Sequence, residues 1–452
     1  MLSNHKSYAK IALTITMLLT ILLLAISCKE CPSEPKPEPE YNIYLSVEYV
    51  LCTWVTLKVT LPDSGKINSF SMDRNDSTIA TYTSNDNDTL ITDEGLTPDT
   101  DFSYKVRFLK DGKIKSESEP VTVHTMPTTS HNFVWEIDTL GNYGSYLNDV
   151  WIIDENDIWV VAYLRVDDPD SSFDGTGQET FNAARWDGEK WNLMLIVNPD
   201  PLYSIFYFNE NDMWMSNGLP IHWDGNNWTL YHIQQMGISA NVEYGIWGTS
   251  SLDIYFVGRF GSIVHYNGST FRKIESGTDI GLTDIYGYLN SRIFICGYNR
   301  TDGRCILLSG DHSGLKKIYE SDDYDYYGRV ELSSVFQSVW IYDNQLYIAT
   351  SAGFWHQSIS SKKGLLCLWT EVIENRIWPN CIRGTAHNNI FIVSDKGDVI
   401  HFNGVTFENY IGTQGIEYGP PQLYFVDCKD DLVVACGVLN STYQGIVYKG
   451  RQ

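Results

Sequence analysis

The stretch IHWDGNNW, residues 221–228, places an Asp-Gly pair between a histidine and two tryptophans. Nearly the same pattern returns as VHYNGSTF at 264–271 and as IHFNGVTF at 400–407, and a looser copy, ARWDGEKW, begins at Ala184. Such repetition indicates a chain built from copies of one small unit. Asp-Gly and Asn-Gly pairs favour the positive φ angles that a two-residue hairpin turn needs. Each copy therefore predicts the third strand of a unit, a tight turn and the start of the fourth strand.

A second motif, usually an apolar residue followed by an aromatic one, marks the second strand of each unit. It occurs seven times, at Ile158-Trp159, Met213-Trp214, Ile254-Tyr255, Ile293-Phe294, Leu346-Tyr347, Ile390-Phe391 and, without the aromatic, Leu432-Val433. A further aromatic precedes most copies by six or seven residues, on the expected innermost strand: Trp151, Phe206, Trp247, Tyr286, Trp340 and Phe425. Four short strands in each repeat of roughly 40–45 residues are typical of a β-propeller blade.

The last repeat stops after its third strand, in IVYKGRQ at 446–452, and the missing fourth strand is expected in NFVWEI at 132–137. We therefore expect an all-β chain in which residues 131–452 form a seven-bladed propeller closed by an N-terminal strand. The repeats, as in GIWGTSSLDIYFVGRFGSIVHYNGSTF, resemble those of bacterial secreted propellers with Trp-Gly-Thr and His-Tyr-Asn-Gly signatures. This resemblance implies an architecture and no particular activity.

Residues 41–127 alternate apolar and polar positions between turns, which predicts a sandwich of about seven strands. The run Leu96-x-Pro98-x-Thr100-x-Phe102-x-Tyr104 resembles the corner of fibronectin type III domains. In this chain Phe102 stands where the family has its corner tyrosine, and Val59 stands where its core tryptophan is expected. The resemblance implies a spacer or adhesion module.

The first residues predict export. Lys6 and Lys10 precede an apolar run, and LAISC, which ends at Cys28, resembles the lipobox of bacterial lipoproteins. We expect a signal peptide over 1–27, lipidation of Cys28, and a Pro/Glu/Lys spacer over 28–40. An uncleaved membrane anchor is the alternative. The resemblance implies a lipid-anchored cell-envelope protein, in the outer membrane, with either a periplasmic or a surface face.

The charge balance excludes some partners. With 32 basic and 56 acidic residues the formal net charge is −24, which argues against nucleic acid or anionic lipid as a partner. Of the nine cysteines, Cys296 and Cys305 are expected on neighbouring strands, as are Cys428 and Cys436. We favour buried free thiols over disulfides for these four, because a core of this size needs no covalent framework.

The repeated histidines, His222, His265 and His401, are expected to be structural, because equivalent positions in different blades cannot meet on one metal ion. No cofactor or metal is expected. Arg383 occupies an aromatic position on an innermost strand, where it either reaches along the central channel or recognises an anion or carboxylate.

Two long inserts are expected on one face of the propeller, at 165–183 and 320–333. Candidate ligand-binding residues there are Asp168, Asp170, Asp174, Tyr324, Tyr326 and Tyr327. Asp168, Asp170 and Ser172 have part of a calcium-loop spacing, but Phe173 stands where that loop needs glycine, so a solvated acidic loop is the favoured interpretation. Tyrosines among acids suit a sugar or a basic peptide.

The sequence thus favours a non-catalytic binding or scaffold module for protein or glycan, attached to the membrane through its lipid alone. The alternative is a glycosidase or polysaccharide lyase with its site in the propeller channel. Two or three carboxylates converging with Arg or Tyr near the axis would favour the enzyme. A rim that is only aromatic or acidic would favour binding.

Overall fold

The structure is a computed structural model. It describes residues 41–62, 68–168, 177–288, 292–299, 301–321, 336–350, 353–359, 366–369, 378–410 and 420–452. The chain divides into two compact units. Val55–Asp93 and Asp101–His124 belong to the first unit with the chain before residue 50, and Thr125–Gln452 belongs to the second with Val50–Trp54 and Glu94–Thr100. Within the described ranges, no helix has the length and hydropathy needed to cross a bilayer.

The first unit is built from two antiparallel sheets. One has the order β1-β2-β5 and the other β4-β3-β6-β7, with β8 also paired to β6. The strands are β1 (Tyr44–Val50), β2 (Trp54–Thr60), β3 (Asn68–Arg74), β4 (Ser77–Ser84), β5 (Asp88–Glu94), β6 (Asp101–Lys110), β7 (Lys113–Glu117) and β8 (Val121–His124). Alternate residues of β2 and β6, among them Leu57 and Tyr104, are fully buried, as the alternating sequence requires.

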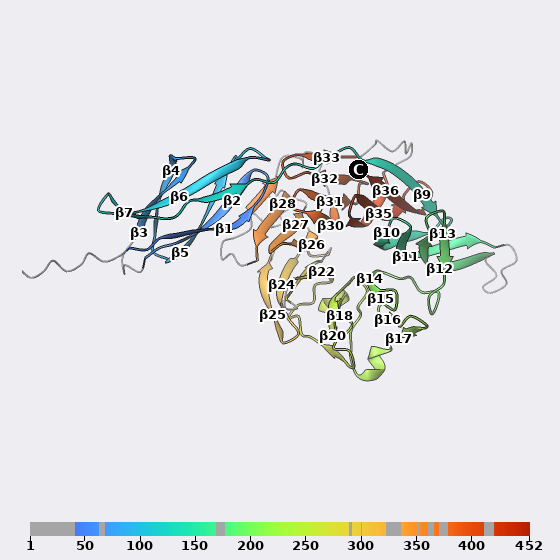
Figure 1. Cartoon of the computed structure of the whole chain (residues 1–452). Coiled ribbons are helices and arrows are strands. Elements are labelled where there is room, and N and C mark those ends of the chain that lie inside the picture. The colour runs from blue at the N-terminus through green and yellow to red at the C-terminus, as the bar shows by residue number, and fades with distance from the viewer. Residues whose placement is uncertain are drawn as a thin grey trace, which may run out of the picture. The chain divides into compact units, whose positions relative to one another are not determined.

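The second unit contains seven four-stranded antiparallel sheets among its described residues, numbered here in chain order (Figure 1). Sheets 1 to 3 are β10 (Tyr146–Asp154), β11 (Asp157–Asp167), β12 (Gln178–Trp186), β13 (Trp191–Met194); β14 (Ser204–Asn209), β15 (Asp212–Ser216), β16 (Pro220–Trp223), β17 (Trp228–Leu230); and β18 (Gly245–Ser250), β19 (Asp253–Val257), β20 (Ile263–Tyr266), β21 (Phe271–Lys273). Sheets 4 and 5 are β22 (Leu282–Tyr288), β23 (Arg292–Tyr298), β24 (Cys305–Asp311), β25 (Gly314–Glu320); and β26 (Phe336–Tyr342), β27 (Gln345–Thr350), β28 (Gly353–Ser358), β29 (Leu366–Trp369). Sheets 6 and 7 are β30 (Pro379–Ala386), β31 (Asn389–Ser394), β32 (Val399–Phe402), β33 (Phe407–Asn409); and β34 (Gln422–Lys429), β35 (Leu432–Leu439), β36 (Gln444–Arg451) with β9 (Val134–Leu140).

The sheets form a closed ring. Each first strand packs against the first strand of the next sheet, and β34 of sheet 7 packs against β10 of sheet 1. The buried apolar side chains fall into clusters that each join two neighbouring sheets, including one that joins sheet 7 to sheet 1. The fourth strand of sheet 7 is β9, which pairs antiparallel with β36 from Val134 to Leu140. The expected closure by an N-terminal strand is therefore present, about two residues later than the sequence suggested.

The turn predicted from the Asp-Gly motif is different in detail. Trp223 pairs with Trp228, so four residues connect the strands instead of two. Only Gly225 has a positive φ, of 90°. Asp224 uses its carboxylate to accept hydrogen bonds from the backbone N–H groups of Asn226 and Asn227, each at 2.8 Å. The prediction of a two-residue turn was wrong because the Asp or Asn side chain takes the role that a backbone carbonyl has in that turn.

Two other expectations need correction. In sheet 7 the second-strand motif, Leu432-Val433, pairs with Lys429 and Cys428, whereas Phe425 pairs with Cys436. The hairpin of sheet 7 lacks the bulge that precedes this turn in several other sheets, so a fixed spacing miscounts it.

The insert at 165–183 is also not simply a loop, because β11 and β12 continue as a paired ribbon as far as Asp167 and Gln178.

Glycines allow tryptophans to pack between the blades. A Cβ added at Gly287 would lie 2.1 Å from the ring of Trp247, and one added at Gly384 would lie 3.0 Å from the ring of Trp340. In both cases the tryptophan belongs to the preceding sheet of the ring. The tryptophan ring of one innermost strand thus packs against a glycine of the next innermost strand, where a side chain would collide with the ring.

Candidate functional site

The repeated histidines are structural, as their positions suggested. His222, His265 and His401 each place Nε2 2.8–2.9 Å from a side-chain oxygen at the start of the second strand, on Asp212, Asp253 and Asn389 respectively. Each imidazole also lies against the aromatic residue directly across the strand pair: Trp214, Tyr255 or Phe391. Arg185 makes the equivalent contacts in sheet 1, with Asp157 and Trp159. These contacts hold the second and third strands together in sheets 1, 2, 3 and 6.

A ring of residues surrounds one end of the central channel. In five innermost strands a β-bulge interrupts the pairing near the start of the strand. The skipped residues are Asn148, Thr283, Gln337, Asn380 and Tyr424, and Tyr203 and Tyr244 occupy the matching positions in sheets 2 and 3. We call these seven residues the bulge ring. Bulges re-aim side chains and are frequent next to functional sites.

Hydrogen bonds tie the bulge ring together from blade to blade. The Asn148 side chain donates to the carbonyl of Leu202 at 2.7 Å, and Thr283 donates to the carbonyl of Gln337 at 2.8 Å. The Gln337 amide donates to Oδ1 of Asn380 at 2.8 Å. These bonds hold the side chains of the ring in place between neighbouring blades.

A cavity of about 730 Å³ opens at the bulge ring, and we call it the basin. All seven bulge-ring residues line it, together with residues from connections between second and third strands and between fourth and first strands, among them Glu243, Arg259, Phe260, Asp279, Tyr298 and Asp395. These connections belong to the face on which the sequence placed the two inserts. The basin has the size and the mixture of aromatic and polar groups of a ligand site.

The rim of the basin carries an exposed and strained aromatic residue. Phe260 is 79% exposed and has a φ of 54°, in the left-handed region that non-glycine residues rarely adopt. Beside it, Arg259 forms an ion pair with Glu243, which is 4% exposed. Such strain persists only where the surrounding structure imposes it, and it is found most often at binding sites.

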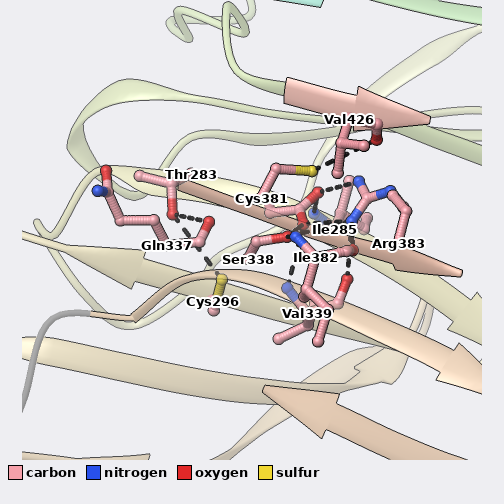
Figure 2. A network of polar contacts seen from close by, with 11 residues as sticks. Thr283, Ile285, Cys296, Gln337, Ser338, Val339, Cys381, Ile382, Arg383 and Val426 are labelled. Atoms are coloured by element: carbon pink, nitrogen blue, oxygen red, sulfur yellow. Dashed lines mark hydrogen bonds and ion pairs between the residues drawn. The ribbon is translucent and has the colours of Figure 1, made fainter. Parts of the chain in front are cut away.

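Below the bulge ring, Arg383 ties three blades together. Its guanidinium group contacts both carboxylate oxygens of Asp284 at 3.0 Å, and it also donates to Oγ of Ser338 at 3.1 Å (Figure 2). Ser338 in turn donates to Asp284 at 2.5 Å. The rings of Tyr286 and Phe425 lie 5.4 Å and 4.7 Å from the guanidinium carbon. The arginine side chain is largely buried instead of reaching along the channel into solvent, and its charge is bound to a carboxylate of this same chain.

Two further carboxylates lie near this network. Asp149, 4% exposed, accepts hydrogen bonds from the backbone N–H groups of Val150 and Ile205. Asp427 accepts from the backbone N–H groups of Ile152 and Cys428. Burial raises the pKa of Asp427 to about 6 and raises the pKa of Asp149 well above its ordinary value. Among the described residues, neither carboxylate is part of an ion pair.

These residues line a second cavity of about 190 Å³, the inner chamber. Its walls carry Asp149, Asp284, Asp427 and Arg383 together with the aromatic side chains Trp151, Phe206, Trp247, Tyr286, Trp340 and Phe425. Tyr244, Asp284 and Phe425 line both the basin and the inner chamber. The two cavities therefore adjoin within the central channel.

Of the ligand-binding candidates named from the sequence, two lie among the described residues. Arg383 lies in the inner chamber, whereas Asp168 lies at the end of the ribbon of sheet 1, where its N–H bonds the carbonyl of Gly177 at 2.8 Å. Five others fall outside the described residues: Asp170, Asp174, Tyr324, Tyr326 and Tyr327. The lipidation candidate Cys28 also falls outside them. Cys296, Cys305, Cys428 and Cys436 are free thiols.

Sequence reasoning missed Asp149, Asp284 and the rim residues. The two aspartates had a signal, because both stand two residues before the innermost aromatic position, where Ser204 and Ser338 stand in other repeats. A small polar residue repeated on a buried strand points to contacts between blades. Phe260 had no such signal, since nothing in its type suggests a left-handed conformation.

No protein-family model matches this sequence, and no curated protein matches it. Two solved structures are similar in fold: YCF48 bound to D1 peptide, with 12% identity and a TM-score of 0.52, and YCF48 from Cyanidioschyzon merolae, with 10% identity and a TM-score of 0.50. The first similarity covers 72% of this chain and 99% of the other, and the second covers 70% and 98%. At these identities the comparison shows a shared β-propeller fold alone.

Proposed function

We propose that this chain is a non-catalytic binding module of the cell envelope, in which the basin holds a protein or glycan ligand. The observation that carries the proposal is the basin itself. Each of the seven sheets contributes one side chain to its ring, at or just before the start of the innermost strand, and in five sheets a bulge interrupts the pairing there. Bulges are frequent next to functional sites.

The fold comparison gives this proposal limited support. One of the similar propellers is described as bound to D1 peptide, so a propeller of this general shape can hold a peptide. The ligand of that protein is not transferred to this chain. What supports a ligand here is the combination of tyrosines, amides and an exposed Phe260 around one cavity.

The remaining parts position the propeller. Cys28 carries the lipid, residues 28–40 form the spacer, and the first unit serves as a spacer or adhesion module of the fibronectin type III kind. Support for the lipid comes from the sequence alone. Support for the first unit comes from its two sheets, with β1, β2 and β5 in one and β3, β4, β6 and β7 in the other, together with the corner motif from Leu96 to Tyr104.

A secreted carbohydrate-active enzyme is the second candidate, and one observation favours it. Asp149, Asp284 and Asp427 line the inner chamber together with Arg383. Carboxylates that converge with an arginine near the axis are what we expected of an enzyme. We rank it second because the contacts of Asp284 are made to Arg383, Ser338 and the backbone of its own chain. Release of reducing or unsaturated sugar ends by the wild-type chain, and its loss in Asp427→Asn, would establish the enzyme.

The experiment for binding is a screen of the full chain against glycan arrays and envelope proteins, followed by variants of both faces. Phe260→Asn removes the ring but keeps a residue type that tolerates the left-handed conformation, so it should weaken binding while the fold stays intact. The insert variants, Tyr324, Tyr326 and Tyr327 to Ala or Asp168, Asp170 and Asp174 to Asn, should weaken it as well.

The matched controls lie on the opposite face. Changes at Glu189, Asn226 or Ser269, which are exposed residues of the turns between third and fourth strands, should leave binding unchanged. A ligand whose binding responds to these turn residues and not to Phe260 would overturn the proposal.

A further inference from the structure

The charges that line the basin and the inner chamber are unevenly matched. Each arginine there already has a carboxylate of this chain: Arg259 pairs with Glu243, and Arg383 pairs with Asp284. On the rim, Asp279 pairs with Arg304. No cation lining these cavities is left to attract an anion.

The carboxylates are in surplus. A carboxylate has about four positions at which it can accept a hydrogen bond, and those of Asp149 and Asp427 each receive two, all from backbone N–H groups. Both residues line the inner chamber, and Asp149 is 96% buried, the complement of its 4% exposure. Two acidic side chains therefore line the cavity, and each can accept further hydrogen bonds.

The walls of the inner chamber suit a cation as well. Seven aromatic side chains line it, three of them tryptophans, and aromatic faces attract alkylammonium and guanidinium groups. Its volume of about 190 Å³ is far larger than the roughly 10–15 Å³ that one water molecule needs. Because Tyr244, Asp284 and Phe425 line both cavities, the inner chamber directly adjoins the basin.

We infer that the inner chamber receives the positively charged end of a lysine or arginine side chain from a protein partner whose backbone lies in the basin. This inference rests on the proposed binding function and names its ligand as a basic peptide segment. The charge of −24 on the whole chain adds a long-range attraction for such a partner. A neutral glycan would leave the two carboxylates of the chamber unmatched.

Binding should be linked to proton release. The groups that face Asp427 and Asp149 are Arg383, Asp284, Tyr286, Lys429 and the thiols of Cys381, Cys428 and Cys436. With the pKa of Asp427 at about 6, part of its population is protonated at pH 6. An entering cation favours the charged carboxylate, so it must displace that proton.

The test is calorimetric titration of the full chain with the capped tripeptide Gly-Lys-Gly and with Gly-norleucine-Gly, which has a similar shape and no charge. The lysine peptide should bind at least about tenfold more tightly, since hydrogen bonds to a charged group outweigh neutral ones. At pH 6 its apparent enthalpy should differ between phosphate and bis-Tris buffers, because binding releases protons that the buffer takes up with a different enthalpy in each case. Equal binding of both peptides, or identical enthalpies, would overturn the inference without any variant.

Variants then locate the site. Asp427→Asn and Asp149→Asn keep an acceptor for the backbone N–H groups and should weaken the lysine peptide about tenfold, with thermal unfolding as the check on folding. Phe260→Asn on the rim separates this inference from the proposed function. If a partner found in the screen depends on Phe260 and not on Asp427, or if a neutral oligosaccharide binds the basin and the lysine peptide does not, the binding function stands and the basic-peptide inference fails.

Discussion

At the scale of single residues, the bond between Arg383 and Asp284 has consequences beyond its own strength. A buried ion pair gains little net stability, because two charges lose their water, but removal of one partner leaves the other charge buried alone. The pair also holds neighbouring strands in place. The Asp284 carboxylate accepts a hydrogen bond from the backbone N–H of Val339, and the Ser338 hydroxyl oxygen accepts one from the backbone N–H of Ile382. Three innermost strands are thus joined through one arginine.

Arg383→Met should therefore destabilise the propeller by about 3–5 kcal/mol, the range found when one member of a buried pair is removed. Guanidinium-induced unfolding followed by tryptophan fluorescence measures the change. In the double variant with Asp284→Leu, much of this loss should be recovered, since no uncompensated charge remains. A double variant that is less stable than Arg383→Met would contradict the role given to the pair.

The buried histidines predict sensitivity to acid. Burial lowers the pKa of His401 to about 3, whereas an unfolded histidine has a pKa of about 6.5. Below pH 6.5 the unfolded chain binds a proton that the folded chain does not, so stability is lost as the pH falls from 6.5 toward 3. For this residue the loss approaches about 1.4 kcal/mol for each pH unit.

His401→Gln should remove that contribution. Its unfolding free energy, measured from pH 7.5 to 4.5, should fall less steeply than that of the wild type, even if the variant is less stable at pH 7.5, where neither state is protonated. Parallel curves would show that His401 does not titrate differently in the two states.

The sequence predicted contacts between residues that are close in the chain, and it did not predict contacts between residues that are far apart in it. The structural role of His222, His265 and His401 followed from their repetition, because the partner of each lies 10 to 12 residues away within the same blade. The partner of Arg383 lies 99 residues away, and nothing in the sequence connects the two. The strained Phe260 was equally hidden, because its conformation is imposed by tertiary contacts.

At the scale of elements, the Asp/Asn-Gly motif is a property of one connection, between third and fourth strands. Asp187, Asp224, Asn267 and Asn403 all accept the backbone N–H groups of the second and third residues that follow. A hydrogen bond from the Asn192 side chain, together with these backbone bonds, lowers the pKa of Asp187 to about 2. The motif is therefore repeated for its side-chain oxygen as well as for its glycine.

Asp224→Ala should lower the thermal stability of sheet 2, because two backbone N–H groups lose their acceptor. Asp224→Asn keeps the oxygen and should be nearly neutral, and Asn226→Ala is the matched control in the same turn. Thermal unfolding of the three variants checks this order. Equal losses in Asp224→Asn and Asp224→Ala would mean that charge, and not the acceptor, is what the turn requires.

The strands themselves could be predicted well from periodicity, and the irregularities could not. Six of the seven second-strand motifs have the expected aromatic opposite an innermost-strand residue, as in Trp151 opposite Trp159. Sheet 7 departs from this, because its hairpin lacks one bulge and Cys428, in place of Phe425, lies opposite Val433. A bulge inserts a single residue, and no residue type marks it reliably. The ring that surrounds the basin depends on such bulges, so it was invisible to pattern counting.

At the scale of the whole molecule, anchoring is a prediction from the sequence alone. Cys28→Ala should leave the chain unprocessed or release it from the detergent phase, because the lipobox resemblance makes this cysteine the acceptor of the lipid. Phase partitioning and fatty-acid labelling in a bacterial host measure it, with Cys31→Ala as the neighbouring control. Unchanged labelling in Cys28→Ala would exclude the lipoprotein assignment.

Closure of the ring concerns every blade at once. Strand β9 completes sheet 7, and Lys449 of β36 forms ion pairs with Glu136 and Asp138 of β9. Without β9, the outer edge of β36 has unpaired backbone groups, and such an edge can pair with other chains. Trp135 and Ile137 would also leave the cluster between sheets 6 and 7.

Deletion of residues 131–138 from the full chain should therefore broaden the unfolding transition of the propeller, lower its midpoint and promote aggregation as concentration rises. Differential scanning calorimetry with light scattering measures all three. The control is deletion of Lys113–Glu117, strand β7 of the first unit, which pairs with β6 and contributes to no blade. That deletion should leave the propeller transition in place. If the propeller loses β9 and keeps both its midpoint and its cooperativity, the ring does not depend on the N-terminal strand, and its stability must come from the contacts between neighbouring innermost strands, including those between β34 and β10.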